Sequence, residues 1–373
     1  MKHYYLIVFA MILLAITSCN QKKNDETPAP AAPETTTVEP TPTYLYVTTG
    51  ACYAGTGNTV FTGTTSSNLV YRLNTKNGLK DTTFADFNSA PATAGDTPTG
   101  MASFDADNLL VLVDTTSGRR IEKMPKSSFS TRSQFVSATT ILSGSLKSIS
   151  KTSDNGYLVS KTNGIEKLTS QGVRLGAPYV PSNMGATCGT NSNINGAVSN
   201  SSGKIFFINA ANSNNRWGVI SANGYSSASD CLAVQAAPSA TSYPVAILYL
   251  KASNQVLVAY AGNSIASPEI NSIYEYDFND STNTIGSGVK IYDANSYVSA
   301  GYLLYGISAM TFDSSDNSLY VATAISTATA VANFQIEKLT YDPNTKTLSR
   351  SSSTPFYSYG VDTKCISSLM VAE

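Results

Sequence analysis

The chain has 373 residues, of which only 13% are charged, and its net charge is −1. A surface this neutral, without a basic stripe, argues against binding to nucleic acid. The one histidine is His3, in a segment that we expect to be removed, so the mature chain would lack the imidazole that Ser-His-Asp and Cys-His nucleophiles and histidine-ligated metals require. These features predict no enzymatic activity, no metal and no other cofactor.

The first 18 residues have the order of a secretory signal peptide: a basic start, a hydrophobic stretch over residues 4–16, and small residues before Cys19. The stretch is too short for a stable membrane span. Residues 16–19, Ile-Thr-Ser-Cys, resemble the bacterial lipobox, and the resemblance implies lipidation of Cys19. By the same resemblance, Asn20 implies the outer membrane. We expect a lipid anchor to be the only contact with the membrane; the sequence leaves open which side of that membrane the domain faces.

Residues 21–43 contain five prolines and many threonines but almost no bulky apolar side chains. Such a segment cannot bury enough surface to fold. We therefore interpret residues 19–43 as a lipidated cysteine followed by a disordered tether. In an extended polyproline conformation, at about 3.1 Å per residue, the tether would hold the domain roughly 70 Å from the lipid. Residues 44–373 form the predicted folded domain.

The clearest repeating unit lies within residues 306–342, where three apolar runs are separated by turn-forming residues. Alternation within the runs predicts three antiparallel strands, which we call first, second and third. The first strands are expected at Gly100–Phe104, Leu146–Ser150, Asn195–Val198, Val245–Leu250, Ile307–Phe312 and Ile366–Val371. The second strands are expected at Tyr44–Thr48, Leu109–Val113, Tyr157–Ser160, Ile205–Ile208, Val256–Tyr260 and Leu319–Thr323. The third strands are expected at Leu69–Leu73, Ile121–Met124, Ile165–Leu168, Trp217–Ile220, Ile273–Phe278 and Ile336–Leu339.

The spacing of the copies, roughly 45 to 65 residues, is typical of four-stranded propeller blades. Small residues such as Ser148 and Ala246 recur within the first strands, as expected where strands crowd around an axis. The domain begins on a second strand and ends on a first strand, so its two ends would complete one blade and close the ring. We predict an all-β, six-bladed propeller. Seven blades are the alternative, because residues 239–365 are long enough for another strand pair.

The second strands also carry a family resemblance. Tyr-Val-Thr-Thr at residues 46–49 and Leu-Tyr-Val-Ala-Thr at residues 319–323, each followed by an Ile-x-Lys-Leu-like strand, resemble the YVTN-type and NHL-like bacterial propellers. The resemblance covers residues 44–373 and implies the propeller fold. It does not define a subfamily or a ligand.

Four cysteines remain after Cys19, an even number in an oxidising compartment, which allows three pairings. Cys365 begins the closing strand, and Cys52 follows the strand that would pair with it. We therefore predict a Cys52–Cys365 disulfide that locks the ring, and a second disulfide between Cys188 and Cys231. Four free thiols are the alternative.

Ligand-binding candidates lie near the starts of the first strands, where one end of the central channel would open. They are Tyr243, Tyr305, Lys147 and Lys364. Aromatic and lysine side chains that converge in this way suit a glycan or a peptide. The alternative is that they cap the ring and contact loops.

Three Asp-rich clusters, at residues 105–108, 153–156 and 313–317, contain oxygen atoms that suit calcium. They lie between first and second strands, where Asp, Asn and Gly are the residues that tight turns need. We interpret them as turns. Trp217, the only tryptophan, is predicted to pack between blades.

The favoured function is a monomeric binding or scaffold module that recruits a protein or a saccharide at the cell envelope. A metal-dependent, lactonase-like hydrolase is an alternative, but it needs acidic or amide side chains on the axis, and the first strands supply few of these. A purely structural envelope protein is a third possibility that the sequence does not separate from the first.

Overall fold

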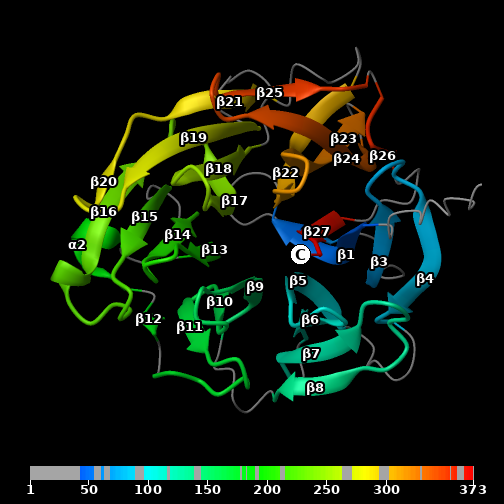
Figure 1. Cartoon of the computed structure of the whole chain (residues 1–373), viewed down its shortest axis with the longest axis horizontal. Coiled ribbons are helices and arrows are strands. Elements are labelled where there is room, and N and C mark those ends of the chain that lie inside the picture. The colour runs from blue at the N-terminus through cyan, green and yellow to red at the C-terminus, as the bar shows by residue number, and fades with distance from the viewer. Residues whose placement is uncertain are drawn as a thin grey trace, which may run out of the picture. The chain divides into compact units, whose positions relative to one another are not determined.

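The computed structural model describes residues 43–53, 60–62, 68–88, 96–115, 118–137, 144–176, 179–181, 183–189, 193–210, 215–262, 271–293, 302–327, 330–352, 354–358 and 365–372. Residues 42–373 form one compact unit. Its strands make six antiparallel sheets that surround a central axis (Figure 1). The unit is therefore a six-bladed β-propeller, as predicted.

Each blade runs from an inner strand at the axis to an outer strand at the rim. The first blade has β27 (Cys365–Val371), β1 (Tyr44–Tyr53), β3 (Leu69–Asn74) and β4 (Lys80–Asp86), with β2 (Val60–Thr62) paired to β1. The second blade has β5 (Thr97–Ser103), β6 (Asn108–Asp114), β7 (Arg120–Pro125) and β8 (Ser133–Val136). The third blade has β9 (Leu146–Lys151), β10 (Tyr157–Lys161), β11 (Gly164–Leu168) and β12 (Val180–Pro181). The fourth blade has β13 (Ile194–Ser199), β14 (Ile205–Asn209), β15 (Arg216–Ile220) and β16 (Cys231–Ala236). The fifth blade has β17 (Tyr243–Leu250), β18 (Gln255–Ala261), β19 (Ser272–Asn279), β20 (Thr284–Ile285) and β21 (Val289–Asp293). The sixth blade has β22 (Tyr302–Asp313), β23 (Ser318–Thr327), β24 (Ala330–Asp342), β25 (Thr347–Arg350) and β26 (Tyr357–Ser358). The fourth blade is accompanied by the short helix α2 (Gly185–Cys188) and the 3-10 helix η2 (Ala228–Asp230).

Every predicted first, second and third strand is present, and the seven-blade alternative is wrong. The length between residues 239 and 365 goes into the long strands β22, β23 and β24, and into outer strands that are split in two: β20 with β21, and β25 with β26. The fourth strands were not predicted. They lie at the rim, where one face is open to solvent, so their apolar pattern is weak; Lys80–Asp86, for example, is mostly exposed or half-buried.

The ring closes as predicted. Strand β27 pairs with β1 in antiparallel register, from Leu45 opposite Val371 to Gly50 opposite Cys365. The first and last strands of the domain therefore share one sheet, and no open inner edge remains between them.

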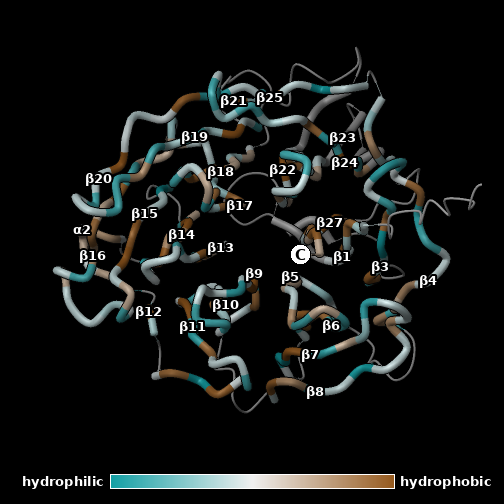
Figure 2. The backbone as a smooth tube through the Cα atoms, in the orientation of Figure 1, coloured by the Kyte–Doolittle hydropathy of each residue, from teal (hydrophilic) through white to brown (hydrophobic). Residues whose placement is uncertain are grey.

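Six apolar clusters hold neighbouring blades together. Each cluster takes residues from two adjacent blades, and the six together run around the whole ring. Figure 2 accordingly shows apolar residues distributed through all the blades. Trp217 is fully buried between the fourth and fifth blades, beside Phe206 and Tyr276, as predicted.

The Asp-rich clusters have turn geometry. Asp105 Oδ1 accepts hydrogen bonds from the backbone N–H groups of Asp107 and Asn108 at 2.9 and 2.6 Å. Asn155 and Asn317 adopt positive φ values of 60° and 55°, which asparagine tolerates better than most residues. Local geometry therefore accounts for the Asp and Asn residues of these loops.

A buried glutamate recurs on the third strands of four blades. Each lies opposite the central aliphatic residue of the second strand, as in the pairs Val159–Glu166 and Val321–Glu337. The four are Glu122, Glu166, Glu275 and Glu337, and none is more than 8% exposed.

Every one of these glutamates has a cationic partner. The ion pairs are Glu122 with Arg120 and Arg132, Glu166 with Lys161 and Arg174, Glu275 with Lys346, and Glu337 with Arg350. Burial of a charge is tolerated when it is paired and hydrogen-bonded in this way. The glutamates therefore belong to the internal structure of the blades.

The predicted disulfide between Cys188 and Cys231 is present, with the two Cα atoms 5.7 Å apart. It joins α2 to the start of β16. Cys365 is also disulfide-bonded. The side chain of Cys52 lies outside the described residues, so the Cys52–Cys365 pairing stays a prediction, which the register of β1 and β27 supports.

The signal peptide, Cys19 and the tether lie outside the described residues. Within the described ranges, no helix is long and apolar enough to cross a membrane.

Candidate binding site in the central channel

A cavity of about 960 Å³ lies along the axis of the ring. Its walls are formed mainly by the innermost strands of all six blades: β5, β9, β13, β17, β22 and β27. These strands pack side by side around the axis, each against the next, and β22 and β27 complete the circle (Figure 1).

Each inner strand has a β-bulge at the equivalent position. At this position the register between an inner strand and its neighbour skips one residue, which has no partner across the sheet; β22 has a further skip at Tyr305. The six skipped residues are Thr99, Lys147, Asn195, Val245, Ser308 and Ser367. All six line the cavity, and we call them the bulge ring. A bulge re-aims a side chain and is frequent beside functional sites.

The residue after each bulge is small, because the inner strands approach one another closely there. The six are Gly100, Ser148, Gly196, Ala246, Ala309 and Ser368. A Cβ atom on Gly100 would lie only 3.2 Å from the Cα atom of Ser148 on the next blade. The small residues predicted for the first strands are thus confirmed in position.

The bulge ring is mostly polar and well buried. Thr99, Lys147, Asn195 and Ser308 are only 7–8% exposed. Ser367 donates a hydrogen bond to the backbone oxygen of Pro98 at 2.9 Å and so joins two blades.

Three polar atoms of the ring are left without protein partners. Thr99 Oγ1, Asn195 Oδ1 and Ser308 Oγ have no hydrogen-bond partner in the part of the chain that the structure describes, although Asn195 Nδ2 donates to the Pro244 oxygen at 3.2 Å. An unpaired buried polar atom costs about 1–3 kcal/mol. Three such atoms from different blades give this cavity polar groups that a bound polar molecule could contact.

The charged residues that line the cavity all have one sign. They are Lys147, Lys151 and Lys251, and the described lining contains no Asp or Glu. Lys147 belongs to the bulge ring. Lys151 is exposed at the opposite end of β9, and Lys251 is exposed in the turn that follows β17. Burial lowers the pKa of Lys147 to about 7, because a charged amine is disfavoured away from water.

Of the four predicted ligand-binding residues, the structure places Lys147 in the cavity wall. Tyr243 is half-buried at the start of β17 and is not among the lining residues. The backbone of Tyr305 lies within β22, but its side chain and the whole of Lys364 lie outside the described residues.

Three site residues, Thr99, Asn195 and Ser308, were not predicted from the sequence. All three lie on or beside the predicted first strands. The bulges that bring their side chains to one cavity leave no signal in the residue pattern, so the pattern alone did not single them out.

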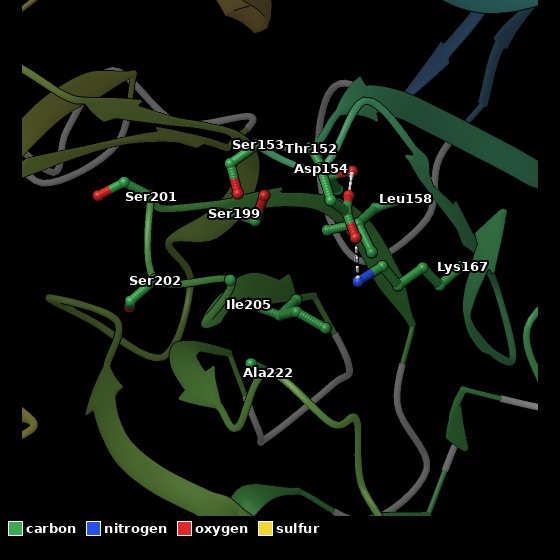
Figure 3. A pocket seen from close by; sticks show the side chains of 11 residues that line it. Thr152, Ser153, Asp154, Leu158, Lys167, Ser199, Ser201, Ser202, Ile205 and Ala222 are labelled. Atoms are coloured by element: carbon green, nitrogen blue, oxygen red, sulfur yellow. Dashed lines mark hydrogen bonds and ion pairs between the residues drawn. The ribbon is translucent and has the colours of Figure 1, made fainter. Parts of the chain in front are cut away.

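A second, smaller pocket of about 250 Å³ lies between the third and fourth blades. Figure 3 shows Asp154 joined to Thr152 and Lys167 on one side, with Ser199 and Ser201 across from them. A hydrogen bond from Thr152 and contact with Lys167 lower the pKa of Asp154 to about 2. Because its charged pair is already satisfied, this pocket offers a ligand less than the bulge ring does.

The described residues contain no group of three or more His, Cys, Asp or Glu side chains that could hold a metal ion.

No family model and no curated protein matches the chain. Solved structures do match it, and they are β-propellers. A protein from Lactobacillus plantarum has a TM-score of 0.53 at 12% identity, over 89% of this chain and 100% of that chain. The periplasmic gluconolactonase of Pseudomonas aeruginosa has a TM-score of 0.49 at 11% identity, over 88% and 98%. A putative 6-phosphogluconolactonase from Bacteroides uniformis has a TM-score of 0.48 at 12% identity, over 88% and 99%.

The prediction that the protein is not an enzyme is contradicted by this comparison, because matching propellers include proteins named as lactonases. The reason for the error is physical. Residues on a propeller axis come from different blades, so they form no contiguous motif that a sequence can reveal. At 11–12% identity the likeness shows the fold alone, and it does not establish an enzymatic activity for this chain.

Proposed function

We propose that this protein is an envelope propeller that binds a saccharide in its central channel. The observation that carries the proposal is the bulge ring, in which buried polar atoms from separate blades line one cavity without partners among the described residues. Hydroxyl, amide and amine groups are the partners that sugar hydroxyls require, and the volume of the cavity, about 960 Å³, lies in the range of small-molecule sites.

The experiment is a calorimetric titration of the purified full-length protein with a panel of monosaccharides and short oligosaccharides. Binding of at least one sugar, and its loss in the double variant Asn195→Leu, Ser308→Ala, is the expected result. Val245→Ala changes the one apolar member of the ring and serves as the matched control. Binding that survives the double variant, or no binding of any sugar, would contradict the proposal.

The proposal includes the lipid anchor at Cys19 and a position at the outer membrane. Its support is the lipobox-like segment before Cys19 and the proline-rich tether after it. Labelling of growing cells with a clickable palmitate analogue tests it: the wild-type protein is expected to carry label in the membrane fraction, and Cys19→Ala to remain unlabelled.

A second candidate is hydrolysis of a lactone, with a metal held in the channel. Asn195 Oδ1, Thr99 Oγ1 and Ser308 Oγ are oxygen atoms of the kind that calcium prefers. The positive side chain of Lys147 in the same ring opposes a cation, which makes this the weaker candidate. Hydrolysis of a δ-lactone that depends on added Ca²⁺ and is abolished by Asn195→Leu would support it.

A further inference from the structure

The one charged side chain of the bulge ring distinguishes a neutral saccharide from an acidic one. Around the ring, Lys147 lies between Thr99 of the second blade and Asn195 of the fourth, and Ser308 lies on the opposite blade. A ligand that fits this arrangement has one negative group on the side of Lys147 and hydroxyl groups for the other three.

We infer that the bulge ring binds a sugar acid, with its carboxylate on the amine of Lys147 and its hydroxyl groups on Thr99, Asn195 and Ser308. The inference rests on the proposed saccharide site and names its ligand class. The ligand is a free sugar acid or the uronic acid residue of a polysaccharide, which share this chemistry.

The charges around the channel favour an anion. Lys147, Lys151 and Lys251 all line the cavity, and its described lining has no carboxylate. Lys147 is the buried member of the three, so its interaction with a carboxylate would be the least weakened by water. The two exposed lysines would draw an anion toward the channel.

The charged side chains on the strands that pack against β9 form ion pairs with other residues of their own blades. Strands β5 and β13 contribute no charged side chain. On β10 and β6, the charged groups are Lys161, paired with Glu166, and Asp114, paired with Arg119. Among the described residues, the charges on these neighbouring strands are therefore paired within their own blades.

Galactose, galacturonate and trigalacturonate are suitable probes. Galacturonate differs from galactose only in having a carboxylate in place of the hydroxymethyl group. We expect the full-length protein to bind galacturonate about tenfold or more tightly than galactose, which is the range of one charge-assisted hydrogen bond. Lys147→Met should abolish this preference and leave galactose binding in place. Lys151→Met, on the same strand and the same cavity, is the matched control and should keep the preference.

The outcomes separate this inference from the proposed function. Equal binding of galactose and galacturonate overturns the inference and leaves the saccharide site standing, whereas no binding of any probe defeats both. A preference that survives Lys147→Met but is lost in Lys151→Met also overturns the inference. Tighter binding of trigalacturonate than of galacturonate supports it with a polysaccharide as the source, and the reverse order supports it with a free sugar acid.

Discussion

The blade interiors and the bulge ring both bury polar groups, but they treat them in opposite ways. Inside the blades, Glu166 and Glu337 are about 1% exposed, and each forms an ion pair with an arginine. Glu166 also forms an ion pair with Lys161. In the bulge ring, Thr99 Oγ1 and Ser308 Oγ are buried without a partner among the described residues. In the first region a residue type repeats from blade to blade; in the second, only the backbone geometry repeats.

This difference teaches which repeats are structural. A buried glutamate that recurs together with a cationic partner belongs to the internal structure of each blade that contains it. A bulge that recurs while its side chain changes from Thr to Lys to Asn uses the fold as a frame for different contacts. Because unpaired buried polar atoms reduce stability, the bulge ring is the region where stability and function are expected to oppose each other.

The largest expected effect follows from removing a cation inside a blade. Arg350 Nε lies 2.8 Å from Glu337 Oε2, so Arg350→Met would leave a buried carboxylate unpaired. We expect the free energy of unfolding to fall by about 3–5 kcal/mol, measured by urea denaturation. As a control, Lys290→Met breaks a partly exposed pair with Asp293 and should cost less than about 1 kcal/mol. Equal losses in the two variants would refute the structural role.

The pH dependence of the same variant has a definite sign. Burial raises the pKa of Glu337, and Arg350 acts in the opposite direction, so the Arg350→Met change should raise this pKa further. A carboxyl group whose pKa is higher in the folded state than in the unfolded state favours folding less as pH rises above its unfolded value. The loss of stability should therefore be greater at pH 8 than at pH 5.

The next effect concerns the Cys188–Cys231 disulfide, which spans 43 residues. Replacement of both cysteines by alanine should lower the free energy of unfolding by about 2–4 kcal/mol, chiefly because the unfolded chain gains freedom. Urea denaturation under oxidising conditions measures this effect. Sugar binding should persist under native conditions, because neither cysteine lines the channel; its loss would show that the fourth blade supports the site more closely than the structure indicates.

A smaller effect is expected from the protonation of Lys147. Because burial lowers its pKa to about 7, the amine is mostly charged at pH 6 and mostly neutral at pH 8. Galacturonate affinity should fall by about tenfold over this interval, whereas galactose affinity should stay nearly constant. A galacturonate affinity that is independent of pH would place the carboxylate on another cation, such as exposed Lys151.

The smallest effect has the opposite sign to the others. Thr99→Val removes a buried hydroxyl oxygen that has no partner within the described residues and keeps the volume of the side chain. The free energy of unfolding without ligand should rise by about 1 kcal/mol, while saccharide binding weakens. Val245→Thr, at the equivalent bulge of another blade, is the mirror control and should lower stability. A loss of stability in Thr99→Val would show that its hydroxyl has a structural partner.

How far the sequence could predict the molecule differs between the two regions. The apolar alternation of the inner three strands identified six blades, their order and the closing pair of β1 and β27. The third strands also include the segment Ile-Glu-Lys-Leu twice, at residues 165–168 and 336–339. A glutamate within an apolar strand could have indicated the buried glutamates.

The bulge ring could not be predicted in the same way. Alternation assigns side chains to faces on the assumption of regular pairing, and one skipped residue changes that assignment. Lys147 was identified because it lies near the start of an inner strand, where one end of the channel was expected. Asn195 and Ser308 were ordinary strand residues until the register showed that they occupy the same position as Lys147.

The most direct test of the bulge ring as the binding site compares the thermal shift that galacturonate produces in three proteins: the wild type, Lys147→Met and Arg350→Met. We predict that Arg350→Met has a lower melting temperature but the same upward shift with galacturonate as the wild type. Lys147→Met should keep its melting temperature, and its shift with galacturonate should fall to the size that galactose produces. The reverse pattern, a stability loss in Lys147→Met together with an intact shift, would contradict the assignment of Lys147 in the bulge ring as the group that binds the carboxylate.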